Sequence, residues 1–461
     1  MLRLIILLLG LLLPLPVSAQ KVVPETKAQI QFSYAPIVKT SAPAVVNIYT
    51  KKIVKTRTSG MGLFFNDSFL NQFFGDLPDT GFIRNHIERS LGSGVIVRAN
   101  GVVVTNNHVI DGADEIIIAL NDKREFAAKV LGTDKKTDLA ILQIDNKGED
   151  LPYLEIGNSD ALEVGDLVLA IGNPFGVGQT VTSGIVSAKA RAAGGRGDFR
   201  SYIQTDAAIN PGNSGGALVA MDGTLIGVPT IILSKSGQNS GVGMATPSNL
   251  VAITLDSILK TGKVIRPWLG IAGQSISGDI ASTLGLDRAA GVLISRLHKV
   301  SPAAKAGLMV GDIITKIGGE PIDDLENMYY RLVTMPVGGT ISIEVLRRKD
   351  TLSFDVALIP PPEEPARDVK DLSGIFRGIT VTNINPAVIY EKSLDFDEEG
   401  VLVINEPQTR LGLRDGDIVD TINGYKIKEV KDLAKISQKK LDILTLKIKR
   451  GNKVFEIMVR P

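Results

Sequence analysis

The sequence predicts a mainly β protein built from three units. The chain has 461 residues, a length that corresponds to about three domains of ordinary size. Residues 94–228 contain many short apolar runs separated by turn residues, which is the pattern of a β-barrel or β-sandwich. The rest of the chain contains an internal repeat. We therefore expect one larger β unit, followed by two small domains that resemble each other.

The composition excludes several classes of function. Hydrophobic residues make up 44% of the chain, charged residues 22%, and the formal net charge is +1. This balance gives no overall basic field, which argues against nucleic acid as a partner. The chain contains no cysteine, so disulfides, thiolate nucleophiles and cysteine metal sites are excluded.

Residues 1–19 have the pattern of a secretory signal peptide. Arg3 precedes an apolar run at 4–13, and small residues at Val17 and Ala19 fit a signal-peptidase site. A membrane anchor is the alternative, but the run is too short to span a bilayer and ends in prolines. We expect cleavage after Ala19 and an exported, soluble protein.

The β unit begins with an expected strand at 44–48. Residues 51–90 then become irregular and rich in phenylalanine, too irregular for an amphipathic helix. Two interpretations remain open for this stretch. It is either a partly disordered loop or a long loop whose aromatic side chains dock on another surface.

From Gly94 the pattern becomes that of short strands. The runs 95–97 and 102–104 flank the pair Asn100-Gly101, which is a strong hairpin signal. Further strands are expected at 116–120, 139–144, 167–171, 181–186, 217–221 and 225–228.

One helix closes this unit. Pro247 and Ser248 start it and Gly262 stops it. Its apolar side is expected to consist of Leu250, Ile253, Ile258 and Leu259.

The C-terminal part of the chain repeats itself. The segment that begins at Gly307 reappears at Gly412, and a stiff, proline-rich polar linker at 360–365 separates the two copies. Each copy continues into a helical pattern and then a strand, at 325–332 and 341–346 in the first and at 430–437 and 444–448 in the second. Two copies are too few for a solenoid, so we expect two tandem domains.

The chain has three histidines, which narrows the search for a catalytic base. His86 lies in the irregular stretch and His298 in the first repeat, and we expect both at the surface. His108 comes directly after a strand, as a residue of an active site often does. It is therefore the favoured base.

Two further residues complete a possible catalytic set. Asp138 stands where a strand begins, and Ser214 lies among glycines in the run from Gly212 to Gly216. Glycines let such a turn bend sharply and expose a hydroxyl beside backbone amides. The alternative is a glycine-rich hairpin loop in which Ser214 has no chemical role.

These residue types match the needs of acyl transfer. A serine is a weak nucleophile until a base takes its proton, and a histidine held in one tautomer by a carboxylate does this best. His108, Asp138 and Ser214 supply the base, the orienting acid and the nucleophile. The amides of Gly212, Asn213 and Ser214 supply donors for the oxyanion. Taken singly, His108 and Asp138 also fit ordinary strand-end and turn positions.

The serine motif also fits the G-x-S-x-G elbow of α/β-hydrolases. That elbow leads into a helix, and its serine precedes the acid and the histidine. Here residues 217–221 have the pattern of a strand, and Ser214 comes last in the order His, Asp, Ser. Both observations favour a chymotrypsin-like double β-barrel.

Four segments carry a resemblance to a known family. They are Thr105–Val109, Thr137–Ile141, Gly172–Gly176 and Gly212–Leu218. The chain resembles the HtrA/Deg family of exported serine proteases, including two C-terminal PDZ domains. The resemblance implies a signal peptide at 1–19, a trypsin-like protease domain at 20–262, PDZ domains at 264–358 and 372–461, and a linker at 359–371.

The resemblance also implies roles for particular residues. It implies that His108, Asp138 and Ser214 are the triad, that Ile209, Ser240 and Val242 line the substrate pocket, and that 51–90 is a regulatory loop. Residues 187–198 resemble the family's sensor loop, in which Arg191 couples the first PDZ domain to the active site. PDZ domains hold C-terminal peptides on a loop before a strand. That loop is expected at Leu269, Gly270 and Ile271 in the first copy and at Leu372, Gly374 and Ile375 in the second.

The expected function follows from this resemblance. It implies an ATP-independent, PDZ-regulated serine endoprotease that degrades unfolded or damaged proteins in the bacterial envelope and also has chaperone activity. It implies a periplasmic protein that assembles as a homotrimer and into larger cages, and that needs no metal or other cofactor. The alternative is a peptide-binding chaperone or scaffold with a silent protease domain.

Overall fold

The computed structural model describes residues 33–55, 85–173, 178–192, 201–232, 240–405, 411–437 and 443–460. The expected signal peptide and residues 56–84 of the phenylalanine-rich stretch lie outside these ranges. Among the helices in the described ranges, none is long and apolar enough to cross a membrane.

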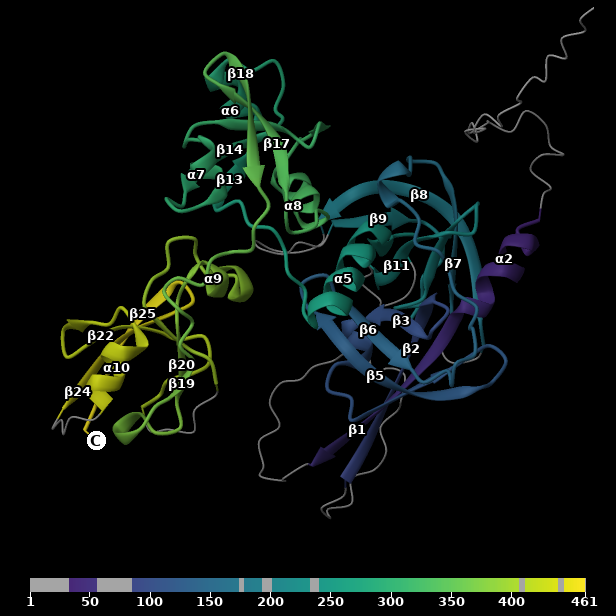
Figure 1. Ribbon diagram of the computed structural model, residues 1–461, viewed down its shortest axis with the longest axis horizontal. Helices are drawn as coiled ribbons and strands as arrows, with labels where there is room; N and C mark the ends of the chain where they lie inside the picture. The colour runs from purple at the N-terminus through teal and green to yellow at the C-terminus, as the bar shows by residue number, and fades with distance from the viewer. Residues whose placement is uncertain are drawn as a thin grey trace, which may run out of the picture.

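The first unit contains two closed barrels (Figure 1), each with six strands. The first barrel has the order β1-β2-β3-β6-β5-β4. Its strands are β1 (Val45–Lys55), β2 (Asn85–Arg98), β3 (Val102–Asn106), β4 (Glu115–Ala119), β5 (Glu125–Asp134) and β6 (Leu139–Ile144). The second barrel has the order β10-β11-β12-β9-β8-β7. Its strands are β7 (Leu167–Gly172), β8 (Thr180–Ala192), β9 (Ser201–Thr205), β10 (Ala217–Ala220), β11 (Leu225–Ile232) and β12 (Gly243–Pro247).

Several strands are buried on both faces, which explains their continuous apolar runs. In β6, Leu142 and Ile144 point into the core of the first barrel. Because side chains alternate along a strand, Leu139 and Ile141 point the other way. There they join a core cluster that also contains Ile171 of the second barrel. Each barrel thus has its own core, and a third core cluster lies between the two barrels.

The phenylalanine-rich stretch begins and ends as regular structure. β1 and β2 pair antiparallel as far as Lys55 and Asn85. The expectation of a loop over the whole of 51–90 is therefore wrong for 51–55 and 85–90, which extend a hairpin.

The expected closing helix is α5 (Ser248–Thr261). It starts after Pro247, and Gly262 ends it in the left-handed conformation with a φ of 74°. The apolar side differs in part from the prediction, because Leu259 is 41% exposed whereas Val251 and Leu255 are buried. The shorter helices of this unit are α2 (Ala35–Ser41), η1 (Ala42–Ala44), α4 (Asn107–Ile110) and η2 (Ser159–Ala161).

The repeat forms two domains with related sheets. The first has the strand order β13-β14-β15-β17-β18, with β16 beside β15. Its elements are β13 (Ile271–Ser275), α6 (Gly278–Leu284), β14 (Val292–Leu297), α7 (Pro302–Ala306), β15 (Ile313–Ile317), β16 (Glu320–Pro321), α8 (Leu325–Val333), β17 (Thr340–Arg347) and β18 (Asp350–Ala357).

The second repeat domain carries one additional strand at its edge. Its order is β19-β20-β21-β22-β24-β25, with β23 beside β22. Its elements are β19 (Lys370–Asp371), η4 (Gly374–Phe376), β20 (Thr380–Asn383), α9 (Pro386–Lys392), β21 (Val401–Val403), β22 (Ile418–Ile422), β23 (Tyr425–Lys426), α10 (Val430–Ser437), β24 (Leu444–Arg450) and β25 (Lys453–Val459).

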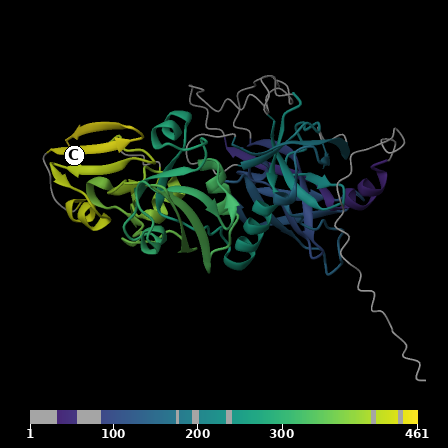
Figure 2. The same ribbon diagram turned by 90° about the horizontal axis from the view of Figure 1, so that it is seen from above.

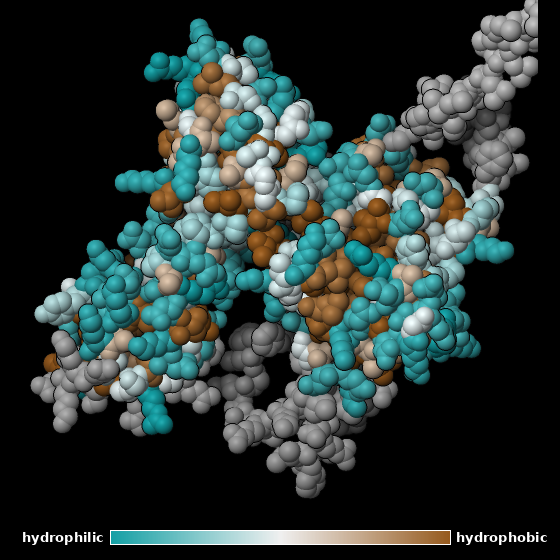
Figure 3. All heavy atoms as spheres, in the orientation of Figure 1, coloured by the Kyte–Doolittle hydropathy of each residue, from teal (hydrophilic) through white to brown (hydrophobic). Residues whose placement is uncertain are grey.

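Both repeat domains lie on one side of the barrels, as Figures 1 and 2 show. Arg266, in the connection after α5, forms a buried ion pair with Asp134 at the end of β5. Lys136 lies over the ring of Tyr390 from α9, 4.2 Å from its centroid. Leu250 of α5 packs in a small apolar cluster with Tyr330 and Val333 of α8. Figure 3 shows apolar surface gathered over the barrels near α5, on the face toward the viewer.

Candidate active site

His108 and Asp138 form a closely bonded pair. The short helix α4 follows β3, and its residues Val109 and Ile110 are buried in the first barrel. This leaves the His108 side chain 49% exposed. Nδ1 of His108 lies 2.5 Å from Oδ2 of Asp138, and the His108 amide donates to Oδ1 at 2.9 Å. Both carboxylate oxygens therefore hold the same residue, which fixes the ring orientation and directs Nε2 away from the acid.

The backbone around Asp138 is held in an unusual conformation. Its φ is 56°, in the left-handed region that costs a residue other than glycine about 1 kcal/mol or more. Two hydrogen bonds to the Asp138 carbonyl offset this conformational cost. The Asp138 carbonyl accepts the amide of Asn107 at 3.0 Å and Nδ2 of Asn106 at 2.9 Å. The acid is thus positioned by the residues that precede the histidine.

A buried chain of polar side chains extends this support into the second barrel. Nδ2 of Asn106 also donates to Oγ1 of Thr230 at 3.1 Å, and Thr230 shares a hydrogen bond of 2.9 Å with Thr246. All three residues are buried. The pattern of the sequence did not reveal Asn106 and Thr230, because each contacts residues that are distant along the chain.

The loop that carries Ser214 begins with a tight turn. The Asn213 amide donates to the Asn210 carbonyl at 3.0 Å, and Gly212 has a φ of 98°. This is the pattern of a type II turn, which requires a positive φ at that position. The Asn213 amide is thus already used, so it does not belong with the expected oxyanion donors. The amides of Gly212 and Ser214 donate no hydrogen bond within the described part of the chain.

Ser93 of β2 attaches this loop to the first barrel. Its amide donates to the Ser214 carbonyl at 2.9 Å, and its hydroxyl donates to the Gly212 carbonyl at 2.6 Å. The hydroxyl also accepts the Asn173 amide at 2.9 Å. Sequence reasoning missed Ser93, although its place between Gly92 and Gly94 is typical of a close backbone approach.

Gly215 allows the same close contact. A Cβ at this position would lie 2.2 Å from the Ser93 carbonyl oxygen and 2.3 Å from Oγ1 of Thr105. Its φ of 83° also favours glycine. The structure therefore brings the serine loop of the second barrel against the strands of the first barrel that lead to His108.

The expected pocket residues differ in their surroundings. Ile209 is fully buried in the core of the second barrel, so it offers no accessible surface to a ligand. Val242, just before β12, is half-buried, and Ser240 is exposed. The local sequence could not indicate that Ile209 is buried, because an apolar residue suits a barrel core as well as a pocket.

Arg191 lies in a strand rather than in a mobile loop. β8 continues to Ala192, and the backbone of Arg191 pairs with that of Tyr202 in β9. The expectation of a loop is thus wrong for residues 187–192, because the strand continues there. Residues 193–200 and the Arg191 side chain lie outside what the structure describes.

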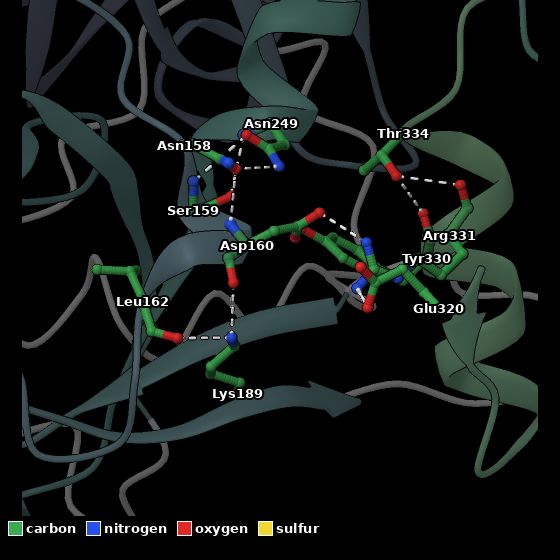
Figure 4. A network of polar contacts seen from close by, with 10 residues as sticks. All are labelled: Asn158, Ser159, Asp160, Leu162, Lys189, Asn249, Glu320, Tyr330, Arg331 and Thr334. Atoms are coloured by element: carbon green, nitrogen blue, oxygen red, sulfur yellow. Dashed lines mark hydrogen bonds and ion pairs between the residues drawn. The ribbon is translucent and has the colours of Figure 1, made fainter. Parts of the chain in front are cut away.

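Asp160 of η2 connects the barrels to the first repeat domain (Figure 4). Its carboxylate accepts the Tyr330 hydroxyl and Nη1 of Arg331, each at 2.7 Å. Its backbone carbonyl accepts Nζ of Lys189 from β8 at 2.9 Å. Burial, reinforced by the Asp160 charge, raises the pKa of Tyr330, so this tyrosine stays a hydrogen-bond donor. Helix α8 is therefore linked to β8 through one residue, Asp160, whose carboxylate binds α8 and whose backbone carbonyl binds Lys189.

The ion pair of Asp134 and Arg266 lies on the segment that leads to Asp138. Both side chains are at least 90% buried within the protein. Burial alone raises the pKa of the Asp134 carboxyl, but the Arg266 guanidinium and hydrogen bonds from Thr137 and Lys136 outweigh it and hold this pKa below its usual range. The carboxylate is charged at neutral pH and belongs to the structural frame of the site.

The other two histidines, His86 and His298, lie outside the candidate active site. The ring of His298 packs edge-on against Trp268 with centroids 5.5 Å apart, and against Phe396 of the second repeat domain at 6.4 Å. It is half-buried, so the expected surface position is only partly right. His86 lies in β2 opposite Val54, and its side chain is outside the described part of the structure.

The expected peptide loop of the second repeat domain requires a correction. In the first domain Ser275 pairs with Val292, and in the second Asn383 pairs with Val401. Gly270 stands five residues before Ser275, and Gly378 five before Asn383. The equivalent of Gly270-Ile271 is thus Gly378-Ile379. Leu372 lies before it, between β19 and η4, and Gly374 and Ile375 lie in η4.

Comparison with known proteins agrees with this architecture. A family described as trypsin-like peptidase domain matches residues 92–228, and a family described as PDZ domain matches residues 267–358. The fold and site define a trypsin-like serine peptidase followed by PDZ domains. The repeat domains are called PDZ1 and PDZ2 below.

Relatives that match nearly the whole chain identify the family. Periplasmic serine endoprotease DegP of Escherichia coli (strain K12) is 36% identical over 480 residues, which cover 98% of this chain and 97% of the relative. Periplasmic pH-dependent serine endoprotease DegQ of the same organism is 37% identical and covers 93% of this chain and 91% of its own. A solved structure, HtrA-type protease AlgW with decapeptide, is 44% identical, covers 72% of this chain and all of its own, and has a TM-score of 0.53. The chain belongs to the HtrA family of periplasmic serine endoproteases, which confirms the family and the mainly β fold predicted from the sequence.

Proposed function

We propose that the chain is an ATP-independent endoprotease for unfolded periplasmic proteins, with Ser214 as nucleophile, His108 as base and Asp138 as orienting acid. The observation that carries this proposal is the pair of bonds from the Asp138 carboxylate to His108. One bond joins the ring at 2.5 Å and the other the amide at 2.9 Å. A histidine held in this way presents Nε2 as a base in a single tautomer.

The chemistry proceeds in two halves. Oγ of Ser214 attacks the peptide carbonyl carbon while His108 takes the hydroxyl proton on Nε2. The carbonyl oxygen becomes an oxyanion, which the free amides of Gly212 and Ser214 stabilise. His108 then gives the proton to the leaving amine, and the acyl group remains on Ser214. Water, deprotonated by His108, repeats the attack and releases the acid.

The loop of Ser214 is ordered by contacts that do not depend on substrate. The Ser93 hydroxyl bonds the Gly212 carbonyl at 2.6 Å, and the Ser93 amide bonds the Ser214 carbonyl at 2.9 Å. Because these bonds use carbonyls, the amide side of the loop is left for the oxyanion. Fixed donors of this kind stabilise a developing charge without reorganisation when the reaction occurs.

Regulation by peptides is part of the proposal. A peptide with a free C-terminus would add as a strand beside β13 in PDZ1, with its carboxylate at Leu269, Gly270 and Ile271. Helix α8, which borders that groove, reaches β8 through Arg331, Asp160 and Lys189. We include Arg191 of β8 as the residue that transmits the effect of peptide binding in PDZ1 to the amides that bind the oxyanion.

The test is cleavage of unfolded casein by the purified protein without nucleotide. The parent should degrade casein, whereas Ser214→Ala should abolish degradation and still bind casein. Cleavage at a near-parental rate by Ser214→Ala would end the serine-protease assignment. A silent parent that nevertheless binds casein would favour the alternative of a chaperone or scaffold.

A further inference from the structure

The two PDZ domains differ at the strand that accepts a peptide. In the described part of PDZ1, β13 pairs with β14 alone, so its other edge has no strand partner. In PDZ2, the corresponding strand β20 pairs with β21 on one edge and with β19 on the other. A PDZ ligand binds by adding a strand to this second edge. The edge in PDZ2 is therefore already paired.

The segment at this edge runs in the direction of a ligand. Lys370 pairs with Val381 and Asp371 with Thr380, in an antiparallel register. The Leu372 amide then donates to the Ile379 carbonyl at 2.9 Å. The segment thus advances toward Gly378-Ile379, the equivalent of the carboxylate-binding loop, as the C-terminus of a bound peptide would.

Leu372 occupies the place of an apolar ligand side chain. It is 4% exposed and belongs to the PDZ2 core cluster that includes Ile379 of the loop and Val430 and Leu433 of α10. Helix α10 corresponds to α8, which borders the open groove of PDZ1. Beyond Leu372 the chain does not end in a carboxylate but continues into η4, which packs on α10.

Side-chain contacts fasten the segment further. Oγ1 of Thr380 donates to the Asp371 carboxylate at 2.6 Å, across the same pair of strands. By contrast, the neighbouring Val369 is 58% exposed and belongs to none of the core clusters. The paired residues Lys370 and Asp371 are exposed as well, so Leu372 is the residue of this segment whose side chain is buried.

We propose that residues 370–372 are a built-in ligand of PDZ2, so that external C-terminal peptides bind to PDZ1 only. A ligand joined to its site by a short chain acts at an effective concentration of about millimolar. An external peptide must displace it, whereas the PDZ1 groove is open. The two copies of the repeat thus have different roles, one as a receptor and one closed by its own chain.

The test measures how many peptides bind per chain. Ser214→Ala prevents cleavage and serves as the parent. The probe is a labelled peptide that ends in phenylalanine with a free carboxylate, titrated calorimetrically, and its C-terminal amide is the negative control. The parent should bind about one peptide per chain, and Leu372→Asp should bind about two because the PDZ2 edge opens. Val369→Asp, three residues earlier and exposed, should still bind about one.

A second variant identifies the PDZ1 site. Leu325 of α8 lies next to β13, with Cδ1 3.5 Å from the place of a Cβ on Gly273. Leu325→Arg should abolish peptide binding in the parent and leave about one peptide bound in combination with Leu372→Asp. Two sites in the parent, or binding that survives Leu325→Arg alone, would overturn the proposal.

Hydrogen exchange provides a test that needs no substitution in either PDZ domain. In the parent, saturating peptide should slow amide exchange in residues 271–275 and leave residues 379–383 unchanged. Slower exchange in 379–383 on addition of peptide would show that the peptide enters PDZ2, and the proposal would be wrong. An unchanged profile there, together with protection of 271–275, supports it.

Discussion

The amide of Ser93 donates a hydrogen bond of 2.9 Å to the carbonyl of Ser214, across the junction of two barrels that each close separately. The same residue bonds the Gly212 carbonyl through its hydroxyl. Ser214 and the turn at Gly212 are therefore positioned from the barrel that also carries His108 and Asp138. This arrangement explains how two separately formed barrels produce one site.

Ser93→Ala should lower kcat while KM changes little. The substitution leaves the Gly212 carbonyl and the Asn173 amide without their buried partner, a loss of about 1–3 kcal/mol. If about half of this loss appears in the transition state, kcat falls roughly 2- to 12-fold. The measurement is cleavage of a peptide substrate over a range of concentrations. Ser41→Ala is the matched control, since Ser41 is also buried but its hydroxyl has no hydrogen-bond partner among the residues that the structure describes. Equal kinetics for both variants would contradict the role of Ser93.

Asp138→Asn should reduce kcat by roughly 10⁴-fold, because an amide stabilises the wrong histidine tautomer. The side chain is similar in size, so the fold should persist, as circular dichroism can verify. Asp111→Asn, at an exposed carboxylate paired with Lys135 at 3.5 Å, is the control and should retain activity. A loss of only a few-fold in Asp138→Asn would mean that another group orients His108.

Asp160→Asn should weaken the stimulation of proteolysis by a C-terminal peptide. The variant loses the charge that binds Arg331, and with it a connection between the PDZ1 helix and β8. Removing one such connection lowers a coupling free energy by about 0.5–2 kcal/mol, or roughly 2- to 30-fold in stimulation. Casein cleavage against peptide concentration gives this ratio. Glu320→Gln removes the other partner of Arg331, within PDZ1, and should leave the ratio near that of the parent. If both variants respond alike, Asp160 has no special part in the coupling.

Stability should decrease on acidification because of Asp134. Its pKa is lowered in the folded state, so the ion pair stabilises the fold fully above the unfolded pKa of about 3.9 and is lost as pH falls through the lower folded value. Asp134→Asn should be less stable at pH 7 by about 3 kcal/mol or more, because it leaves Arg266 buried without its partner. Its stability should also depend less on pH below 4.5. Urea unfolding across pH 3–7 measures both, with the exposed Asp145→Asn as control. A parallel pH dependence in variant and parent would exclude this role.

Cleavage should occur mainly after valine, alanine and other small or medium aliphatic residues. Of the expected pocket residues, Ile209 is buried in the barrel core, and the accessible Ser240 and Val242 carry no charge that would attract lysine or arginine. Mass spectrometry of the fragments of an unfolded protein gives the cleavage sites directly. A dominant preference for basic residues would show that other groups form the pocket.

The sequence predicted several of the strands that carry a continuous apolar run. β6 has the bounds expected from its apolar run, 139–144. It did not predict β5, whose residues are mostly exposed or half-exposed. It also missed β12, which contains a glycine and ends at a proline. Such strands depend on pairing with distant neighbours, which a local pattern does not reveal.

The candidate site could be predicted as far as the chemistry of acyl transfer limits the choice of residues. With three histidines in the chain, the order of His108, Asp138 and Ser214 was informative. Ser93 and Thr230 were not predictable, because buried hydrogen bonds between distant segments have no periodic pattern. The PDZ2 loop was misplaced because a glycine followed by isoleucine occurs twice within a few residues, at Gly374 and at Gly378. Strand register alone distinguishes them.

The position of Arg266 determines where the protease domain can be cut. Helix α5 ends at Thr261, so the secondary structure alone would place the end of a protease fragment at Gly262. Such a fragment would lack Arg266 and leave Asp134 as an unpaired buried carboxylate, four residues before Asp138. Breaking a buried pair in this way costs about 3–5 kcal/mol. The shortest autonomous protease fragment therefore extends through Arg266, and weak activity of a shorter one would reflect this missing cation rather than the loss of PDZ1.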